Sequence, residues 1–206
     1  MLTPMGMQAL PKKLLPLILF GIAVTSLCSV QPAQAFTVTM QQVGANVVAT
    51  GNGAIDLSGL NFLFSANGFG GAAVEASFAI LSVGPSAAPV SIYNGLTGPA
   101  SFGSGGAFFA NSGSGDWVTV QGAFGNLWVP QGYVSGTALS SSDTWNNATF
   151  ASLGLTPGTY EWTWGDGGAN QNFTLEIGTA PDGGTTISLL GCALLGLAVL
   201  RRKLAC

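Results

Sequence analysis

Hydrophobic and polar positions alternate along several short segments of the chain, with the period of two that is typical of a half-buried β-strand. The alternation is strict in Phe36–Gln42, Thr159–Trp164 and Phe173–Ile177. Weaker strand patterns occur in Val47–Thr50, Phe62–Ser65, Ala76–Val83, Val90–Tyr93, Trp117–Phe124 and Leu127–Val129. No stretch between these segments repeats with the period of a helix. The pattern therefore predicts an all-β fold.

Glycine-rich turns separate these segments, as in Gly51-Asn52-Gly53 and Asp166-Gly167-Gly168. Several short strands with turn signals between them are typical of β-sandwiches and related two-sheet domains. Residues 36–180 have the length of one domain. We expect them to form a single β-sandwich or jelly-roll-like extracellular domain, flanked by an N-terminal signal helix and a C-terminal transmembrane helix.

The first 35 residues have the three parts of a secretory signal peptide. Lys12 and Lys13 supply the positive charge, Leu14–Val30 is apolar, and Ala33 and Ala35 form the small-x-small pattern that signal peptidase accepts. Cleavage is expected after Ala35. The alternative is an uncleaved anchor helix, because the apolar run is just long enough to span a membrane.

The C-terminal segment, residues 181–206, begins with a polar, turn-forming motif, Pro181-Asp182-Gly183-Gly184. The apolar run 187–200 follows, and it is expected to form a transmembrane helix. At 1.5 Å per residue the run is about 21 Å long, which is shorter than the roughly 30 Å hydrocarbon core. Such a helix suits temporary anchoring.

All five cationic residues of the chain lie near its two ends. Lys12 and Lys13 precede the first apolar run, and the basic stop of Arg201, Arg202 and Lys203 follows the last one. Because basic flanks stay on the cytoplasmic side, the middle of the chain is expected to cross the inner membrane. The predicted localisation is the cell surface or the extracellular space, after transient anchoring.

The order of the tail, with the Pro-Asp-Gly-Gly motif, the helix text of Leu189–Ala198 and the basic end, resembles a PEP-CTERM-type sorting signal. It is most similar to the variant with a Val-Pro-Asp-Ser-Gly motif, although Ala180 replaces Val and Gly183 replaces Ser. The resemblance implies that an exosortase, a polytopic membrane protease, recognises and cleaves the tail. It also implies a Gram-negative source that often makes exopolysaccharide.

Residues 36–180 contain no His, Lys, Arg or Cys. A Ser-His-Asp triad, a thiol nucleophile, a disulfide and a metal site with nitrogen or sulfur ligands are therefore excluded. Seven carboxylates give this region a net charge of −7, and such a surface repels nucleic acid. The composition predicts a protein that is not an enzyme and has no required cofactor.

Calcium is the one metal that the composition leaves open, because it accepts oxygen ligands from irregular loops. Asp166, Asn170 and Asn172 supply such oxygens within one segment. The alternative is a simple hairpin turn between Trp164 and Phe173, where Asp and Gly are common turn residues. Both interpretations remain open at this stage.

Tryptophan side chains stack on the apolar faces of sugars, and Trp145 is the candidate for such a contact because polar residues flank it. Trp162 and Trp164 alternate with polar residues and are expected in the core. The leading hypothesis is a non-enzymatic protein of the cell surface or exopolysaccharide matrix, processed by signal peptidase and an exosortase. The alternatives are a carbohydrate-binding module and a calcium-dependent adhesin.

Overall fold

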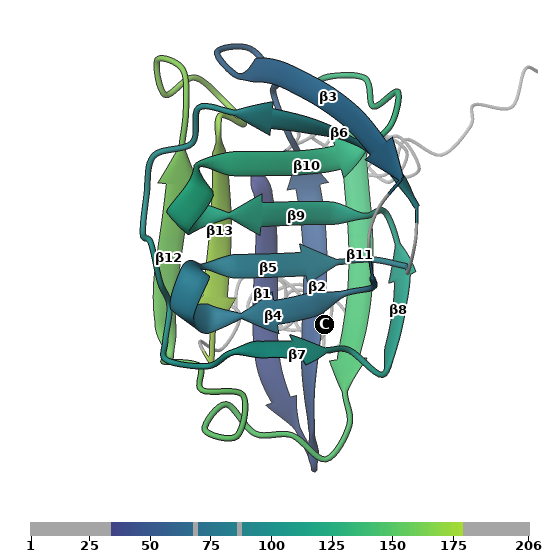
Figure 1. The fold of residues 1–206 in the computed structure, drawn as a ribbon, viewed down its shortest axis with the longest axis vertical. Helices are drawn as coiled ribbons and strands as arrows, with labels where there is room; N and C mark the ends of the chain where they lie inside the picture. Colours follow the sequence, from purple (N-terminus) through teal and green to yellow (C-terminus); the bar gives the residue numbers. More distant parts are fainter. Residues whose placement is uncertain (1–33, 68–69, 86–87, 179–206) are drawn as a thin grey trace, which may run out of the picture. The chain divides into compact units, whose positions relative to one another are not determined.

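The computed structural model describes residues 34–67, 70–85 and 88–178, which form two β-sheets packed face to face (Figure 1). One sheet has six strands. Their order is β12 (Gly158–Thr163), β13 (Asn172–Ile177), β1 (Phe36–Val43), β2 (Asn46–Ala54), β11 (Ala138–Trp145) and β8 (Ser112–Gly115). The neighbours β1 and β13 are parallel, and the other pairs of this sheet are antiparallel.

The second sheet has seven strands, all paired antiparallel. Their order is β3 (Asn61–Asn67), β6 (Pro89–Asn94), β10 (Asn126–Pro130), β9 (Val118–Gln121), β5 (Ile80–Val83), β4 (Ala73–Glu75) and β7 (Ala107–Phe109). In Figure 1 these strands run across those of the six-stranded sheet rather than along them. This arrangement belongs to the orthogonal class of sheet packing. The expected all-β, two-sheet architecture is confirmed.

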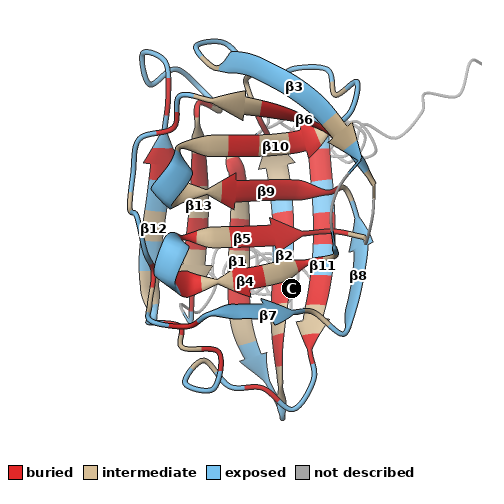
Figure 2. Ribbon diagram, viewed as in Figure 1, coloured by how far each residue is buried: buried red, intermediate tan, exposed pale blue. Residues whose placement is uncertain are grey.

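The core lies between the sheets, and strands such as β1, β11 and β13 alternate buried residues with more exposed ones (Figure 2). In β1 and β13 the strict alternation seen in the sequence corresponds to buried Phe36, Val38, Phe173 and Leu175. Trp162, which is fully buried, packs edge-to-face against Phe173 with ring centroids 5.9 Å apart. The prediction that this tryptophan belongs to the core is confirmed, as it is for Trp164, which is 3% exposed.

Two of the predicted strands are shorter in the structure, because the start of Ala76–Val83 and the end of Trp117–Phe124 form 3₁₀ turns. A 3₁₀ turn, η2 (Ala76–Phe78), separates β4 from β5, and a second turn, η3 (Gly122–Phe124), separates β9 from β10. The two units match in sequence: Val74–Val83 aligns with Val120–Val129, with Phe and Leu at equivalent positions. The interruption arises because Ala79 and Gly125, which end the turns, adopt left-handed conformations with φ of 50° and 65°.

The sequence analysis did not predict four strands: β4, β7, β8 and β11. The largest omission is β11, which pairs with β2 along eight residues and lies inside the six-stranded sheet. Two of its inward positions are polar, Ser141 and Asp143, so its hydrophobic alternation is broken. Room for Ser141 comes from Gly51 of β2, where an added Cβ would lie 2.6 Å from the serine Oγ.

The predicted signal peptide and the predicted transmembrane helix 187–200 lie outside the described residues, apart from Gln34 and Ala35. Within the described ranges, no helix has the length and apolar character needed to cross a membrane.

Asp143 of β11 is a buried carboxylate that joins the two sheets. Its two oxygens accept hydrogen bonds from the backbone N–H of Gly84, at the end of β5, at 3.2 and 2.9 Å. Burial raises the pKa of Asp143 to about 7, and the bond from Gly84 only partly offsets the effect. No cation compensates this charge, because the domain contains none.

The buried carboxyl of Asp143 predicts that the protein is more stable in mild acid. Its pKa in the folded state, about 7, exceeds the ordinary value of 3.8, so the native state binds the extra proton. Stability is therefore greatest below pH 4 with respect to this group and falls as the pH rises toward 7. Urea unfolding should show a free energy about 2–3 kcal/mol lower at pH 8 than at pH 5.

The variant Asp143→Asn, which cannot ionise, should abolish most of this difference. Asp166→Asn, in an exposed turn, is the matched control and should retain it. Equal unfolding free energies at pH 5 and pH 8 in the unmodified protein would contradict the assignment.

Candidate functional site

The outward side of the six-stranded sheet is mostly polar, with Val43, Val48 and Ala138 as apolar exceptions, and we call it the polar face. Because Phe36, Val38 and Met40 point into the core, the residues between them on β1 point outward. The same holds for the other five strands. The polar face consists of Thr37, Thr39, Gln41, Val48, Thr50, Asn52, Ser112, Ser114, Ser140, Ser142, Thr144, Thr159, Glu161, Thr163, Asn172, Thr174 and Glu176.

The strand register places these side chains in rows that cross the sheet. One row joins direct neighbours on all six strands, and its members are Thr159, Glu176, Thr39, Thr50, Ser142 and Ser114. An adjacent row continues the pattern with Glu161, Thr174, Thr37, Asn52 and Ser140. Every member of both rows is a hydroxyl, amide or carboxylate residue, so hydrogen-bonding groups repeat from strand to strand.

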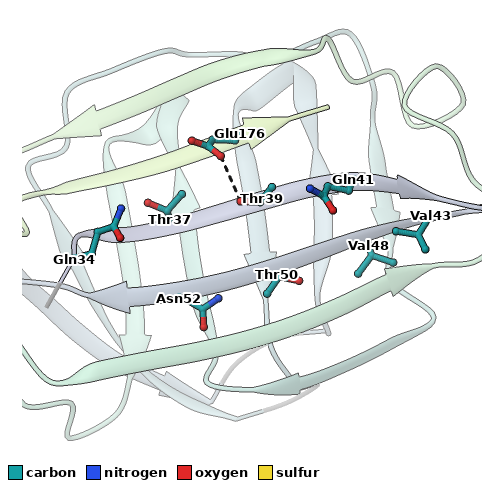
Figure 3. Close-up of a pocket in the computed structure, with 9 residues that line it drawn as sticks. All are labelled: Gln34, Thr37, Thr39, Gln41, Val43, Val48, Thr50, Asn52 and Glu176. Carbon is teal, nitrogen blue, oxygen red and sulfur yellow. Dashed lines mark hydrogen bonds between the residues drawn. The ribbon is translucent and has the colours of Figure 1, made fainter. Parts of the chain in front are cut away.

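A trough of about 500 Å³ lies on the central part of the polar face, over β1 and β2 (Figure 3). Its lining residues are Gln34, Thr37, Thr39, Gln41, Val43, Val48, Thr50, Asn52 and Glu176. The Thr39 hydroxyl donates a hydrogen bond to a carboxylate oxygen of Glu176 at 3.5 Å, drawn as a dashed line in Figure 3. The side chains of Gln41, Thr50 and Asn52 form no hydrogen bond with another described residue.

These groups can bind a neutral polar ligand through donors and acceptors of both kinds. Hydroxyls and amides each donate and accept, whereas Glu176 in its ionised form only accepts. Val43 and Val48 add a small apolar area at one end of the trough. The hydroxyls, amides and carboxylate of the trough equip it to recognise a ligand through hydrogen bonds.

The sequence analysis missed this site because it considered each strand alone. Outward polar residues on one strand are the ordinary solvent-facing half of an alternating pattern. The rows become visible only when the register aligns β11, which was not predicted as a strand, beside β2. Ser140, Ser142 and Thr144 then extend the array outward from β2.

Trp145, the predicted glycan contact, is buried rather than exposed, and this expectation is wrong. Only 2% of the residue is accessible, and its indole Nε1 donates to the backbone oxygen of Phe108 on β7 at 3.0 Å. It is the last inward residue of β11, and its polar neighbours Asn146 and Asn147 are exposed in the turn that follows. A smaller pocket of about 260 Å³ lies beside it, next to Phe108 and Phe109.

The loop proposed for calcium, between β12 and β13, is a hairpin connection whose polar groups bond within the protein. The Asn172 amide donates to Glu161 at 2.8 Å, and the backbone oxygen of Asn170 accepts from the N–H of Asp56 at 2.9 Å. Asn170 itself has a φ of 63°, a conformation that Asn tolerates in turns. Asp166 is exposed at the tip. Over the described ranges, no group of three or more His, Cys, Asp or Glu could hold a metal ion.

Asp56 organises the loops at the end of β2. Its carboxylate accepts hydrogen bonds from the backbone N–H of Ser58 at 2.9 Å and from the hydroxyl of Ser135 at 3.0 Å. The pKa of Asp56 is lowered, chiefly by the bond from the Ser58 backbone and then by hydroxyl donors. Trp164 donates its indole N–H to the Asp56 backbone oxygen at 2.7 Å, which ties this loop to β12. The arrangement is structural, since these bonds all run within the protein.

The predicted signal-peptide cleavage site directly precedes β1. Ala35 forms an isolated bridge with Ala54 of β2, and its carbonyl oxygen accepts from the Thr37 hydroxyl at 3.3 Å. Ala33, the sorting motif Pro181-Asp182-Gly183-Gly184 and the basic stop Arg201-Arg202-Lys203 lie outside the described residues.

Comparison with known proteins gives a match for the tail alone. No curated protein and no solved structure matches the chain significantly. Residues 181–204 match the VPDSG-CTERM motif, which confirms the predicted sorting signal. The chain therefore carries a PEP-CTERM-like C-terminal sorting signal of the VPDSG-CTERM type.

Proposed function

We propose that this protein is a non-enzymatic component of the cell surface or of the exopolysaccharide matrix. The observation that carries the proposal is the VPDSG-CTERM motif at residues 181–204, attached to one all-β domain. Signal peptidase removes the first 35 residues, and the C-terminal helix anchors the exported domain transiently. An exosortase-type membrane protease then cleaves at the Pro181-Asp182-Gly183-Gly184 motif and releases the domain to the outer surface.

The domain's composition supports a role in recognition or structure rather than in catalysis. Residues 36–180 lack His, Lys, Arg and Cys, which supply most general bases, nucleophiles and electrophiles. Asp56, whose pKa is lowered, and Asp143, whose pKa is raised, form hydrogen bonds that hold a loop and join the two sheets. Neither lines the trough on the polar face.

A carbohydrate-binding module is the second candidate function. The observation that favours it is the polar trough over β1 and β2, with its unpaired hydroxyl and amide groups. It replaces the earlier candidate contact, Trp145, which is buried. The two functions are compatible, since a matrix protein that binds glycan remains in the matrix after its tail is cleaved.

Processing at the tail motif can be tested by substitution. The double substitution Pro181→Ala with Asp182→Ala should keep the protein in the membrane fraction, because the protease loses its recognition motif. The unmodified protein should be recovered from the outer surface, with an intact mass that lacks the peptide ending in Cys206. Mass spectrometry of the membrane and surface fractions measures both quantities.

A matched control, Pro157→Ala with Asp166→Ala, changes the same residue types at exposed positions of the domain. It should be sorted like the unmodified protein. Release of the motif variant to the surface, with its tail removed, would contradict processing at this motif.

The calcium requirement can be tested with a chelator. We expect no metal requirement, because hydrogen bonds within the protein already hold the candidate loop. The Asn170 backbone oxygen accepts from the Asp56 N–H, and the Asn172 side-chain amide donates to Glu161. Excess EDTA should therefore leave the melting temperature unchanged. A bound ion at 100 times its dissociation constant would contribute about 2.7 kcal/mol, which a thermal melt detects. A clear fall in melting temperature that added calcium reverses would instead support the calcium-dependent adhesin.

A further inference from the structure

We propose that the polar face binds an extended, uncharged polysaccharide that follows the rows across the strands and passes over the central trough. The inference rests on the proposed function, which brings the domain to a glycan-containing layer, and it adds the site and the class of ligand. Three features of the polar face support it: the spacing of its hydrogen-bonding rows, its negative charge, and the side chains that have no hydrogen-bond partner in the protein.

The rows of the polar face repeat at a distance that suits a sugar chain. Neighbouring strands lie about 4.8 Å apart, which is close to the length of one pyranose unit in an extended chain. The row through Thr39, Thr50 and Ser142 therefore presents one hydrogen-bonding group per strand and per sugar unit. The adjacent row through Thr37 and Asn52 provides a second set of hydrogen-bonding side chains, which can contact the other edge of the same sugar units.

The charge of the domain selects an uncharged ligand. Residues 36–180 carry seven carboxylates and no cation, and two of the carboxylates, Glu161 and Glu176, lie on the polar face itself. A polyuronate or sulfated glycan would be repelled and would find no cationic partner. A neutral glycan meets no such repulsion, and its hydroxyls can donate to the Glu176 carboxylate.

Part of the trough keeps its hydrogen-bonding groups free, although the Thr37 and Thr39 hydroxyls bond to Ala35 and Glu176. The outer side of the other sheet differs: Ser82 and Thr119 are 8% and 1% exposed, and their hydroxyls bond to each other at 2.9 Å. The indole of Trp117 donates to Thr119 and so completes that internal network. In the trough, by contrast, Thr50 and Asn52 are exposed, and their side chains form no hydrogen bond with another described residue.

The strands also hold these groups in place. Each trough residue on β1 and β2 alternates with a buried residue of the core, such as Val38 or Ala49. Side chains on a packed sheet lose little further freedom when a ligand binds, and this lowers the entropic cost of many weak hydrogen bonds. Binding is expected to be cumulative along the polysaccharide, with a weak contribution from each sugar.

The test is affinity electrophoresis of the purified full-length chain in a polyoxyethylene detergent, which carries no sugar headgroup. The gels contain a soluble β-glucan, a galactomannan, a dextran or a polyuronate. We expect at least one of the three uncharged polysaccharides to retard the protein, and the polyuronate not to retard it. Because the assay uses purified protein, its result is independent of whether the tail is sorted in cells.

The decisive variant is Thr39→Val with Thr50→Val, which removes two hydroxyls and keeps the β-branched shape that strands favour. Loss of two hydrogen bonds should weaken binding about tenfold. The control is Ser101→Ala with Thr156→Val, at exposed positions outside the six-stranded sheet, and it should bind like the unmodified protein. If the first variant does not fold, Gln41→Met tests the same trough and should weaken binding about threefold.

Three results would overturn the inference. They are no retardation by any uncharged polysaccharide, stronger retardation by the polyuronate, or equal weakening by the trough and control variants when their melting temperatures agree with that of the unmodified protein. Failure of this test with correct sorting in cells would remove the glycan site alone. Binding without sorting would remove the proposed delivery and leave the site.

Discussion

Every carboxylate between residues 36 and 178 lacks a positively charged partner within that region, because the region contains no Lys, Arg or His. Negative charge must then be stabilised by N–H groups, hydroxyls or solvent. Asp143 accepts from the Gly84 backbone, Asp56 from Ser58, and Asp116 from the N–H of Ser140. The bonds of Asp143 and Asp116 join segments that belong to different strands or loops, and the bond of Asp56 stabilises the loop after β2.

Backbone N–H groups thus take the place that salt bridges occupy in most domains. The bond between Asp143 and Gly84 joins the six-stranded sheet to the seven-stranded sheet, inside the sandwich. Gly84 fits there because its φ is 109° and because an added Cβ would lie 2.3 Å from the Asp116 backbone oxygen. The Asp143 carboxylate therefore depends on a glycine at position 84. The same lack of cations means that no salt bridge on the polar face competes with a neutral ligand.

Sequence patterns predicted the strands whose inward residues are all apolar. In β1 and β13 every second residue is large and hydrophobic, so the period of two was visible, and the structure confirms it. The pattern failed for β11, where Ser141 and Asp143 occupy inward positions. Trp145 then seemed to lie in a polar loop, although it is the last buried residue of that strand.

The candidate site was hidden for a related reason. A row such as Thr39, Thr50 and Ser142 combines residues from strands that are distant in sequence, and only the register brings them together. The parallel pairing of β1 with β13 was likewise not predictable from local pattern, because it depends on how the chain returns from the last hairpin to the first strand. Composition, in contrast, predicted the scarcity of reactive groups without any knowledge of pairing.

The position of the strands makes the proposed processing at both ends compatible with a stable domain. The strands of the described residues lie between Phe36 and Ile177, so the proposed cleavages after Ala35 and near Pro181 would cut none of them. Because β1 and β13 are parallel, the start of β1 and the end of β13 lie at opposite ends of this pair, with Met40 beside Ile177. Removal of the leader costs the bond from the Ala54 N–H to the Gln34 oxygen, about 1 kcal/mol. At the other end of the domain, Gly178 follows β13 and donates its N–H to the Met40 oxygen at 2.9 Å.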